Sequence, residues 1–483
     1  MTENKTRDLF GEVDFFHKIA SVMVAAALLA LTSCAAVGPD FTPPPPEAPA
    51  AWNTVLEAGM TADPADAEIL AKWWTVFDDP VLSGLISQAA GGNLDLKQAE
   101  SRIREARARR GVANAGFFPT LDTSGAYTRR YSSNTTNNFY RAGFDAGWEI
   151  DIFGGTRRAV EAADANLEAS HENLKDVLVT LAAEVGLNYV ETRTFQRQLA
   201  VANDNLRVQE ETYDLIQFRY QAGLSDELAL QQARYNFEST RAKIPNLRTG
   251  VAEAKNRLAV LTGKAPGGVD AILAEGRPIP VTPPTVAVGI PAETLKRRPD
   301  IRNAEKELAA QTALVGVATA DLYPRLRLSG TIGLEAMESA NFFKSASRFW
   351  NFGPGVSWNV FDAGDIRGSI EIQSAVQEQS LIAYEQTVLN ALAEAENALI
   401  AYANEQLRRE RLIDAVEAAQ KAETLARDKY RSGLVNFTTV LDAQRSLFSF
   451  QEQLAISEGA VTSDLVQLYK ALGGGWESAA PVK

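Results

Sequence analysis

The sequence predicts an α+β membrane protein that is built by internal duplication and combines β-hairpins with very long helices. Three observations lead to this prediction. A unit of about 205 residues occurs twice, each copy holds two strands that alternate apolar and polar residues, and each copy holds a proline-free helical stretch of roughly 100 Å. After an apolar run at 19–31, no stretch approaches the ~20 apolar residues of a transmembrane helix, so the strands are expected to meet the membrane.

The duplication is visible as short motifs that recur in the same order. Residues 94–100 (LDLKQAE) match residues 299–305 (PDIRNAE), and Trp148 has its counterpart in Trp358. Tyr-Gln-Ala-Gly-Leu at 220–224 likewise matches Tyr-Arg-Ser-Gly-Leu further along the chain. Because this period lies far outside the range of solenoid repeats, we interpret it as one half-domain copied once. Its order is helix, two strands, long helix, turn, helix.

The N-terminus predicts the compartment. The apolar run at 19–31 is too short to span a membrane and is typical of a secretory signal. It ends in Leu-Thr-Ser-Cys, which resembles the bacterial lipobox, and Cys34 is the only cysteine. The resemblance implies removal of residues 1–33 and a covalent lipid at Cys34, as N-palmitoyl and S-diacylglycerol groups. Ala35 favours sorting to the outer membrane, and no other cofactor is expected.

Composition argues against several other classes of function. A net charge of −13 and a pI near 5.0 argue against a nucleic-acid partner, which requires a basic surface. His171 is the only histidine after the predicted signal, so histidine-based metal binding or acid–base catalysis is not expected. Adjacent carboxylates at Asp78-Asp79 are typical of turn and capping groups. We therefore predict no metal site, no catalytic residues and no enzymatic activity.

Two hairpins have the period-two pattern of strands with one apolar face. They are expected at 120–151, where the polar residues 132–138 predict a loop, and at 325–361, where Trp358 and Val360 continue the apolar face. The pattern fits a transmembrane barrel and a half-buried soluble sheet about equally well. The lipoprotein signal, without any other spanning element, favours the barrel.

Four strands in one chain are too few to form a barrel of their own. The smallest barrels have about eight strands, and sheet edges are not tolerated in lipid. Copies of the chain are therefore expected to share one sheet. Two chains would supply eight strands and three would supply twelve, and the strand pattern leaves both open.

The helical segments are long and lie at corresponding places in the two copies. Helices are expected at 155–222 and 364–431, each ~100 Å long, with shorter return helices at 225–262 and 435–472. A glycine in each intervening turn fits a left-handed helix cap. A coiled-coil scaffold would show the same helices, but it would not carry amphipathic hairpins.

The domain boundaries follow from these elements and from two segments rich in proline and glycine. They are a signal peptide at 1–33, a lipidated tether and opening segment at 34–80, a first repeat at 81–266, a linker at 267–290, a second repeat at 291–473 and a C-terminal tail at 474–483.

Several motifs together carry a family resemblance. They are the lipobox followed by Gly38-Pro39-Asp40-Phe41, the opening Trp74 with Phe77-Asp78-Asp79-Pro80, the joints Phe118-Pro119 and Tyr323-Pro324, and Tyr430 and Gly433 followed by VLDAQRSL at 440–447. This combination resembles the outer-membrane efflux lipoproteins, the TolC-like and NodT-like outer-membrane factors of resistance–nodulation–division pumps. The resemblance implies a homotrimer with a twelve-stranded transmembrane β-barrel continuous with a long periplasmic α-helical barrel.

The same resemblance implies location, partners and sites. The protein would lie in the outer membrane, in contact with its lipid, with a large periplasmic extension. It would bind a periplasmic membrane-fusion adaptor and serve an inner-membrane transporter of the resistance–nodulation–division type. Asp442, Thr438 and Tyr430 match the periplasmic constriction, where three copies of Asp442 would converge; the first repeat has Gln232 instead. The helix-tip turns would contact the adaptor through Gly223, Leu224, Gly433 and Leu434.

The sequence therefore predicts a passive outer-membrane exit duct of a tripartite efflux pump that conducts drugs or other small molecules. One alternative is a type I protein-secretion outlet of the same fold, which only its partners would distinguish. A second alternative is an acylated coiled-coil scaffold without a pore. Neither the cargo nor the particular pump follows from the residues.

Overall fold

The computed structural model describes residues 36–45, 48–64, 66–283 and 285–476, so the predicted signal peptide and Cys34 lie outside the described residues. The chain divides into two compact units. One contains Arg104–Ala169, Glu305–Ala383 and the described part of Met1–Pro44, and the other contains Pro45–Ile103, Ser170–Ala304 and the chain from Tyr384 onward. Each unit thus draws on both sequence repeats.

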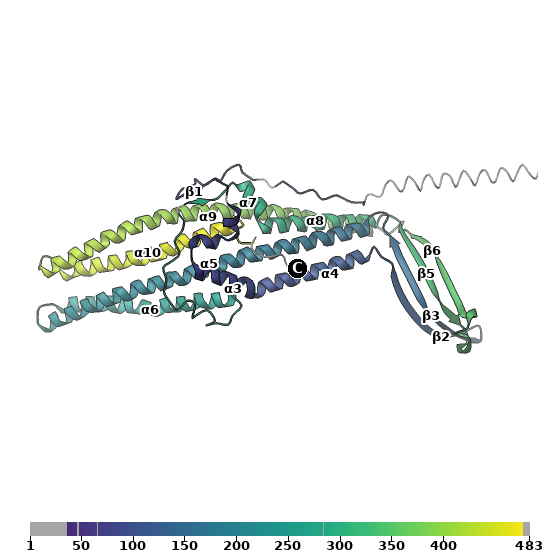
Figure 1. Cartoon of the computed structure of the whole chain (residues 1–483), viewed down its shortest axis with the longest axis horizontal. Coiled ribbons are helices and arrows are strands. Elements are labelled where there is room, and N and C mark those ends of the chain that lie inside the picture. The colour runs from purple at the N-terminus through teal and green to yellow at the C-terminus, as the bar shows by residue number, and fades with distance from the viewer. Residues whose placement is uncertain (1–35, 46–47, 65, 284, 477–483) are drawn as a thin grey trace, which may run out of the picture. The chain divides into compact units, whose positions relative to one another are not determined.

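The first unit contains a four-stranded antiparallel sheet with two strands from each repeat (Figure 1). The strands are β2 (Thr120–Ser132), β3 (Thr135–Ile150), β5 (Arg325–Ala336) and β6 (Arg348–Ser357), in the order β2-β3-β5-β6. The two repeats meet between β3 and β5, where Trp148 lies opposite Leu328. Strands β2 and β6 are the edges, and each has one side unpaired within the described chain.

One face of this sheet is apolar and exposed. Its exposed large side chains are Leu121, Tyr127, Tyr131, Phe144, Trp148, Leu328, Ile332, Trp350, Phe352 and Val356. On the opposite face the Asp145 carboxylate accepts hydrogen bonds from Ser124 Oγ at 3.1 Å and Thr331 Oγ1 at 2.7 Å. A half-buried soluble sheet would cover its apolar face with other elements, whereas this one is bare.

The first hairpin is longer than the sequence predicts. Residues 132–138 do not form a loop, because β2 runs to Ser132 and β3 begins at Thr135. Only Ser133 and Asn134 connect the strands, with φ of 53° and 57°, as in the two-residue turns whose twist suits antiparallel hairpins. The expectation was wrong because polar residues are compatible with a strand that is exposed to solvent.

The second hairpin ends earlier than predicted. Strand β6 stops at Ser357, which pairs with Arg325, the first residue of β5. Trp358 and Val360 therefore have no strand residue opposite them, and the apolar alternation continues past the strand. The Trp358 indole instead donates to the Leu322 carbonyl at 3.1 Å.

The second unit contains two long helical hairpins. Helix α5 (Gly155–Gln221) returns as α6 (Glu227–Leu261), and α9 (Asp365–Arg431) returns as α10 (Phe437–Ala471), as Figure 1 shows. Both α5 and α9 begin in the first unit, have 67 residues each and extend ~100 Å. No helix among the described residues is both long and apolar enough to cross a membrane.

The remaining elements of the described chain are shorter. They are β1 (Met60–Thr61), α2 (Ala67–Ala71), η1 (Trp73–Phe77), α3 (Pro80–Gly92), α4 (Leu94–Ala115), β4 (Val286–Ala287), α7 (Pro291–Arg297), α8 (Pro299–Ala320), η2 (Ser339–Asn341) and η3 (Ser345–Ser347). Helices α4 and α8 lead into β2 and β5. Strands β1 and β4 pair in parallel, so the opening segment lies against the linker.

The main core of the second unit surrounds Trp73, which is fully buried. Its ring stacks on Tyr469 of α10 at 6.0 Å and meets the rings of Trp74 and Phe77 edge-on. Aromatic contacts of this kind add to the free energy gained by burying the rings. The tryptophan-rich opening segment is therefore part of the core.

Asp464 on α10 provides a pH-dependent test of this packing. Burial, together with the charge of Glu405 on α9, raises its pKa from 3.8 to about 6. Below about pH 4 the carboxyl is protonated in both the folded and unfolded states, so it carries no differential cost; above about pH 6 the folded state bears an unfavourable charge. We expect Asp464→Asn to stabilise the protein at pH 7.5 by about 1–2 kcal/mol, allowing for solvent screening.

Thermal unfolding followed by circular dichroism between pH 4 and pH 7.5 measures this effect. The stability gained by Asp464→Asn should disappear at the acid end of this pH range. The control is Asp414→Asn, because this carboxylate is 70% exposed and should show no such pH dependence. An equal gain at both ends of the range would contradict the assignment.

Candidate functional site

The turns at the tips of the two helical hairpins have the same backbone geometry. Gly223 and Gly433 have φ of 70° and 73°, and each donates its N–H to the carbonyl three residues earlier, at 2.9 and 3.0 Å. Leu224 and Leu434 donate to the carbonyl five residues earlier, at 2.8 and 2.9 Å. This is the Schellman motif, which requires a residue with positive φ and so favours glycine. The leucines are 69% and 73% exposed, which leaves an apolar side chain uncovered at each tip.

Tyr430 is half-buried at the tip and packs against its apolar cluster. It packs with buried Ile216, Phe437 and Leu441, and its ring centroid lies 5.5 Å from that of Phe437. The guanidinium of Arg219 on α5 lies 5.3 Å from the Tyr430 ring, a cation–π distance. Tyr430 therefore contacts α5 of the first hairpin from α9 of the second.

Thr438 and Asp442 lie on the exposed part of α10. The Asp442 side chain is 68% exposed and accepts a hydrogen bond at 2.7 Å from Arg445 on the next turn of the same helix. Its repeat mate Gln232 has a buried side-chain oxygen without a hydrogen-bond partner among the described residues. The two repeats therefore differ here, with an exposed carboxylate in the second and a half-buried amide in the first.

A contact that the sequence did not reveal holds the segment just after Cys34. Arg158 of α5 has a side chain only 4% exposed and pairs with Asp40 at 2.6 Å. Its guanidinium also donates to the carbonyl oxygens of Val37, at 3.1 Å, and Gly38, at 3.4 Å. Val37 donates in turn to the Phe153 carbonyl at 3.0 Å. We call residues 36–40 together with Arg158 the N-terminal clasp.

Glycine is required in the clasp for two reasons. Gly38 has φ of 90°, and a Cβ there would lie 2.4 Å from the Gly316 Cα. The Gly-Pro-Asp motif thus combines a left-handed residue in close contact with α8 and a carboxylate for Arg158. The motif was noted from the sequence, but its cation was missed because it lies 118 residues away in a helix of ordinary composition.

Comparison with known proteins identifies the family. The model of the family described as outer membrane efflux protein matches residues 85–264 and again residues 290–474. The chain belongs to the outer membrane efflux protein family. The two matches to the family model also separate the two repeats, since each repeat is matched once.

Characterised relatives extend over almost the whole chain. Nodulation protein T of Rhizobium leguminosarum bv. trifolii is 32% identical, covering 94% of this chain and 97% of the relative. The pyoverdine export outer membrane protein OpmQ of Pseudomonas putida is 34% identical over 92% and 96%. The cation efflux system protein CusC of Escherichia coli K12 is 32% identical over 92% and 97%.

Solved structures of outer membrane efflux channels share the fold. The outer-membrane channel OprN superposes with a TM-score of 0.85 at 36% identity, covering 91% of this chain and 99% of OprN. The open state of the MtrE outer membrane channel of Neisseria gonorrhoeae gives 0.80 at 27% identity, over 92% and 99%. This protein is accordingly an outer-membrane efflux channel with a large periplasmic helical part. Within the described residues, no cluster of histidine, cysteine, aspartate and glutamate is arranged to hold a metal ion.

Proposed function

We propose that three copies of this chain form the outer-membrane exit duct of a tripartite efflux pump. The observation that carries the proposal is the four-stranded sheet, with its exposed apolar face and its two unpaired edges. An unpaired backbone edge is not tolerated in lipid, so β6 of one copy would pair with β2 of the next. Three copies of four strands make twelve, a closed barrel without edges.

The lipid anchor at Cys34 belongs to the same proposal. Acylation as N-palmitoyl and S-diacylglycerol would supply several acyl chains, at about 0.8 kcal/mol for each buried CH₂. The N-terminal clasp begins at residue 36, so the lipidated cysteine would lie within two residues of a fixed point on α5. The anchor would then hold the chain at the membrane while its strands assemble.

The helix tips are the proposed contact with the rest of the pump. Exposed Leu224 and Leu434 stand at two matching turns, and three copies would present six such turns to a periplasmic membrane-fusion adaptor. The adaptor would connect the duct to an inner-membrane transporter of the resistance–nodulation–division type. Asp442, Thr438 and Tyr430 are assigned to the closed constriction near these tips. The cargo stays open, since the relatives are named for cations, pyoverdine and nodulation.

The oligomeric state in detergent tests this proposal. The full chain has a mass of 52.4 kDa, and protein extracted from outer membranes should sediment near three times the mass of the mature chain, after subtraction of bound detergent. Circular dichroism on the same fraction verifies that the helices are folded. A folded, detergent-solubilised monomer would contradict the shared barrel, because its sheet edges would then be stable without partners.

A further inference from the structure

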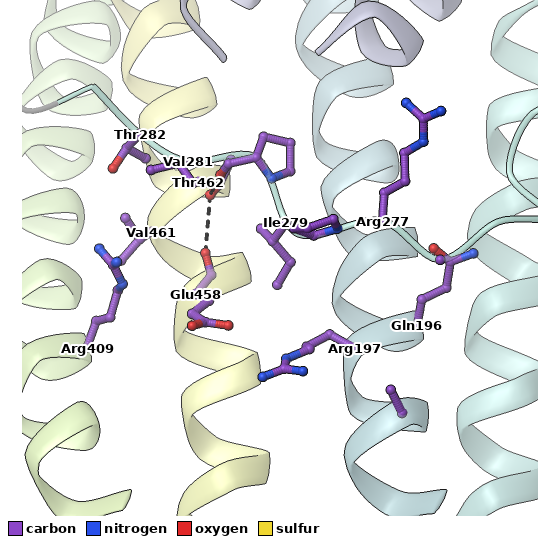
Figure 2. A pocket seen from close by; sticks show the side chains of 14 residues that line it. Gln196, Arg197, Arg277, Ile279, Val281, Thr282, Arg409, Glu458, Val461 and Thr462 are labelled. Carbon is purple, nitrogen blue, oxygen red and sulfur yellow. Dashed lines mark hydrogen bonds between the residues drawn. The ribbon is translucent and has the colours of Figure 1, made fainter. Parts of the chain in front are cut away.

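A cavity of about 530 Å³ lies in the second unit, beneath the linker between the repeats. Its walls come from α5, from the linker, from α9 and from α10, so both repeats contribute to it (Figure 2). Much of the lining is apolar: Ala200, Ile279, Val281 and Val461 together with Pro278 and Pro280. The volume falls within the range of ~300–1,000 Å³ that is usual for small-molecule sites.

The roof of this cavity is held in place from both sides. We call linker residues 273–282 the strap. On one side Gln196 and Arg193 of α5 donate to strap carbonyl oxygens at 2.9 and 2.7 Å. On the other side Thr462 of α10 donates to a strap carbonyl at 2.9 Å, and Gln406 of α9 donates to a strap hydroxyl at 3.2 Å. The cavity is therefore preformed, which lowers the entropic cost of binding.

Three arginines from three different elements are among the residues that line the cavity. They are Arg197 of α5, Arg277 of the strap and Arg409 of α9, and the only carboxylate in the lining is Glu458 of α10. Figure 2 shows Arg197 and Arg409 on opposite sides of Glu458. In Figure 2 the Arg277 guanidinium points away from the other two, so Arg197 and Arg409 against Glu458 leave a formal excess of one positive charge, in a chain whose net charge is −13.

These arginines are poorly neutralised by the protein itself. Arg197 has no ion pair or hydrogen bond within the part of the chain that the structure describes. Arg409 donates at 3.3 Å to the Oε1 atom of Gln406, which is a neutral amide. Arg277 has a carboxylate, Glu275, at 3.6 Å. The positive charge in the cavity is thus available to a ligand.

A buried charge next to the cavity also favours an anionic ligand. Arg193 is fully buried, and its Nε and Nη2 atoms have no hydrogen-bond partner among the described residues. Its Nη1 donates to Gln196 Oε1 at 2.7 Å, and Gln196 lines the cavity. The guanidinium lies 4.9 Å from the Tyr189 ring but has no carboxylate partner among the described residues. A buried cation without a paired carboxylate is unfavourable, and an anion bound in the adjoining cavity would add to its compensation.

We infer that this cavity is a binding site for a small organic anion, a carboxylate or phosphate carried on an apolar body. The anionic group would lie between Arg197 and Arg409, and the apolar body would lie against the proline and branched side chains of the strap. Such a ligand would connect α5 of the first repeat with α9 and α10 of the second. The site is separate from the tips and independent of the proposed pump.

Calorimetric titration of the purified, detergent-solubilised protein with 2-naphthoate, 2-naphthyl phosphate and neutral 2-naphthol tests this inference. We expect both anions to bind, and naphthol to bind much more weakly. Arg197→Gln and Arg409→Gln should each weaken anion binding about tenfold, since each removes a charge-assisted hydrogen bond. The difference between the two anions reports which group the site prefers.

Two further variants separate recognition from damage to the fold. Glu458→Gln removes the competing carboxylate and should strengthen binding. Arg207→Gln, at an arginine of α5 that is 66% exposed and does not line the cavity, should leave affinity unchanged. The inference is overturned if the anions do not bind the wild type, or if they bind it and the two arginine variants equally.

Discussion

Arg298→Ala is expected to lower the free energy of unfolding by about 3 kcal/mol, the low end of what breaking a buried ion pair costs. The Arg298 side chain is only 10% exposed and pairs with Asp300 at 2.8 Å and Glu394 at 2.7 Å. It also donates at 2.8 Å to the carbonyl of Ala471, the last residue of α10. Alanine would leave two carboxylates and a helix end without their common partner.

The stability lost in Arg298→Ala should depend on pH, and the structure predicts the direction of this dependence. Burial, with the nearby charge of Asp300, raises the pKa of Asp176, and Arg298 opposes that shift. Without the arginine Asp176 becomes still harder to ionise, so the folded variant should recover part of its stability as Asp176 is protonated at acid pH. We therefore expect a larger deficit at pH 7.5 than at pH 5.

Thermal unfolding of the two proteins at both pH values measures this deficit. Arg302→Ala is the matched control, because Arg302 lies four residues further along the chain, in α8, is 40% exposed and has one carboxylate at 3.3 Å. Its effect should stay within about 1 kcal/mol. A deficit at Arg298 no larger than that of the control would show that the network is not needed.

Asp442→Ala is expected to raise single-channel conductance and to weaken block by multivalent cations. In the proposed trimer, three copies of this exposed carboxylate would converge near the axis, where a ring of like charges attracts cations. Removing the ring removes both the cation site and the hydrogen bond to Arg445. Planar bilayer recordings on purified protein measure both quantities.

A second variant tests whether Asp442 belongs to the constriction. Arg445→Ala removes the cation that pairs with Asp442 at 2.7 Å, so the unpaired carboxylates should bind multivalent cations more strongly. Asp428→Ala, at an exposed acid on α9, is the control and should change neither property. If Asp442→Ala channels match the wild type in conductance and block, the residue does not belong to the constriction.

The long helices could be predicted to within a few residues because their ends carry local signals. The expected ranges 155–222 and 364–431 compare with Gly155–Gln221 and Asp365–Arg431 in the structure. A glycine with positive φ follows the end of α5 and the end of α9, and Asp226 caps the start of α6 through its side chain. Such signals are contained in a few neighbouring residues, so a sequence shows them directly.

Strand ends were harder to predict, since they depend on the partner strand. Ser132 and Thr135 belong to strands although their neighbours are polar, and Trp358 is outside a strand although its neighbours alternate. In both cases the pairing register sets where the strand ends. Strand β5 begins at Arg325, so it offers no residue that could pair with β6 after Ser357. Period-two alternation identifies a strand but does not locate its ends.

Contacts between distant segments could not be predicted at all. Arg158 lies 118 residues from Asp40, and the three arginines of the cavity lie on three separate elements. Nothing in the local pattern distinguishes these arginines from those on exposed helix faces. The tip residues were assigned only through the family resemblance, and the structure adds that Tyr430 is half-buried at the tip while the Asp442 side chain is exposed.

Single-channel recording of the purified wild-type protein in planar lipid bilayers tests the central claim most directly. We expect discrete, reproducible conductance steps, because the three chains of the proposed trimer would enclose a continuous water-filled path through the barrel. Heat-denatured protein from the same preparation should give none. Folded, membrane-inserted protein that produces no conductance under any gating condition, the Asp442→Ala variant included, would contradict an exit duct.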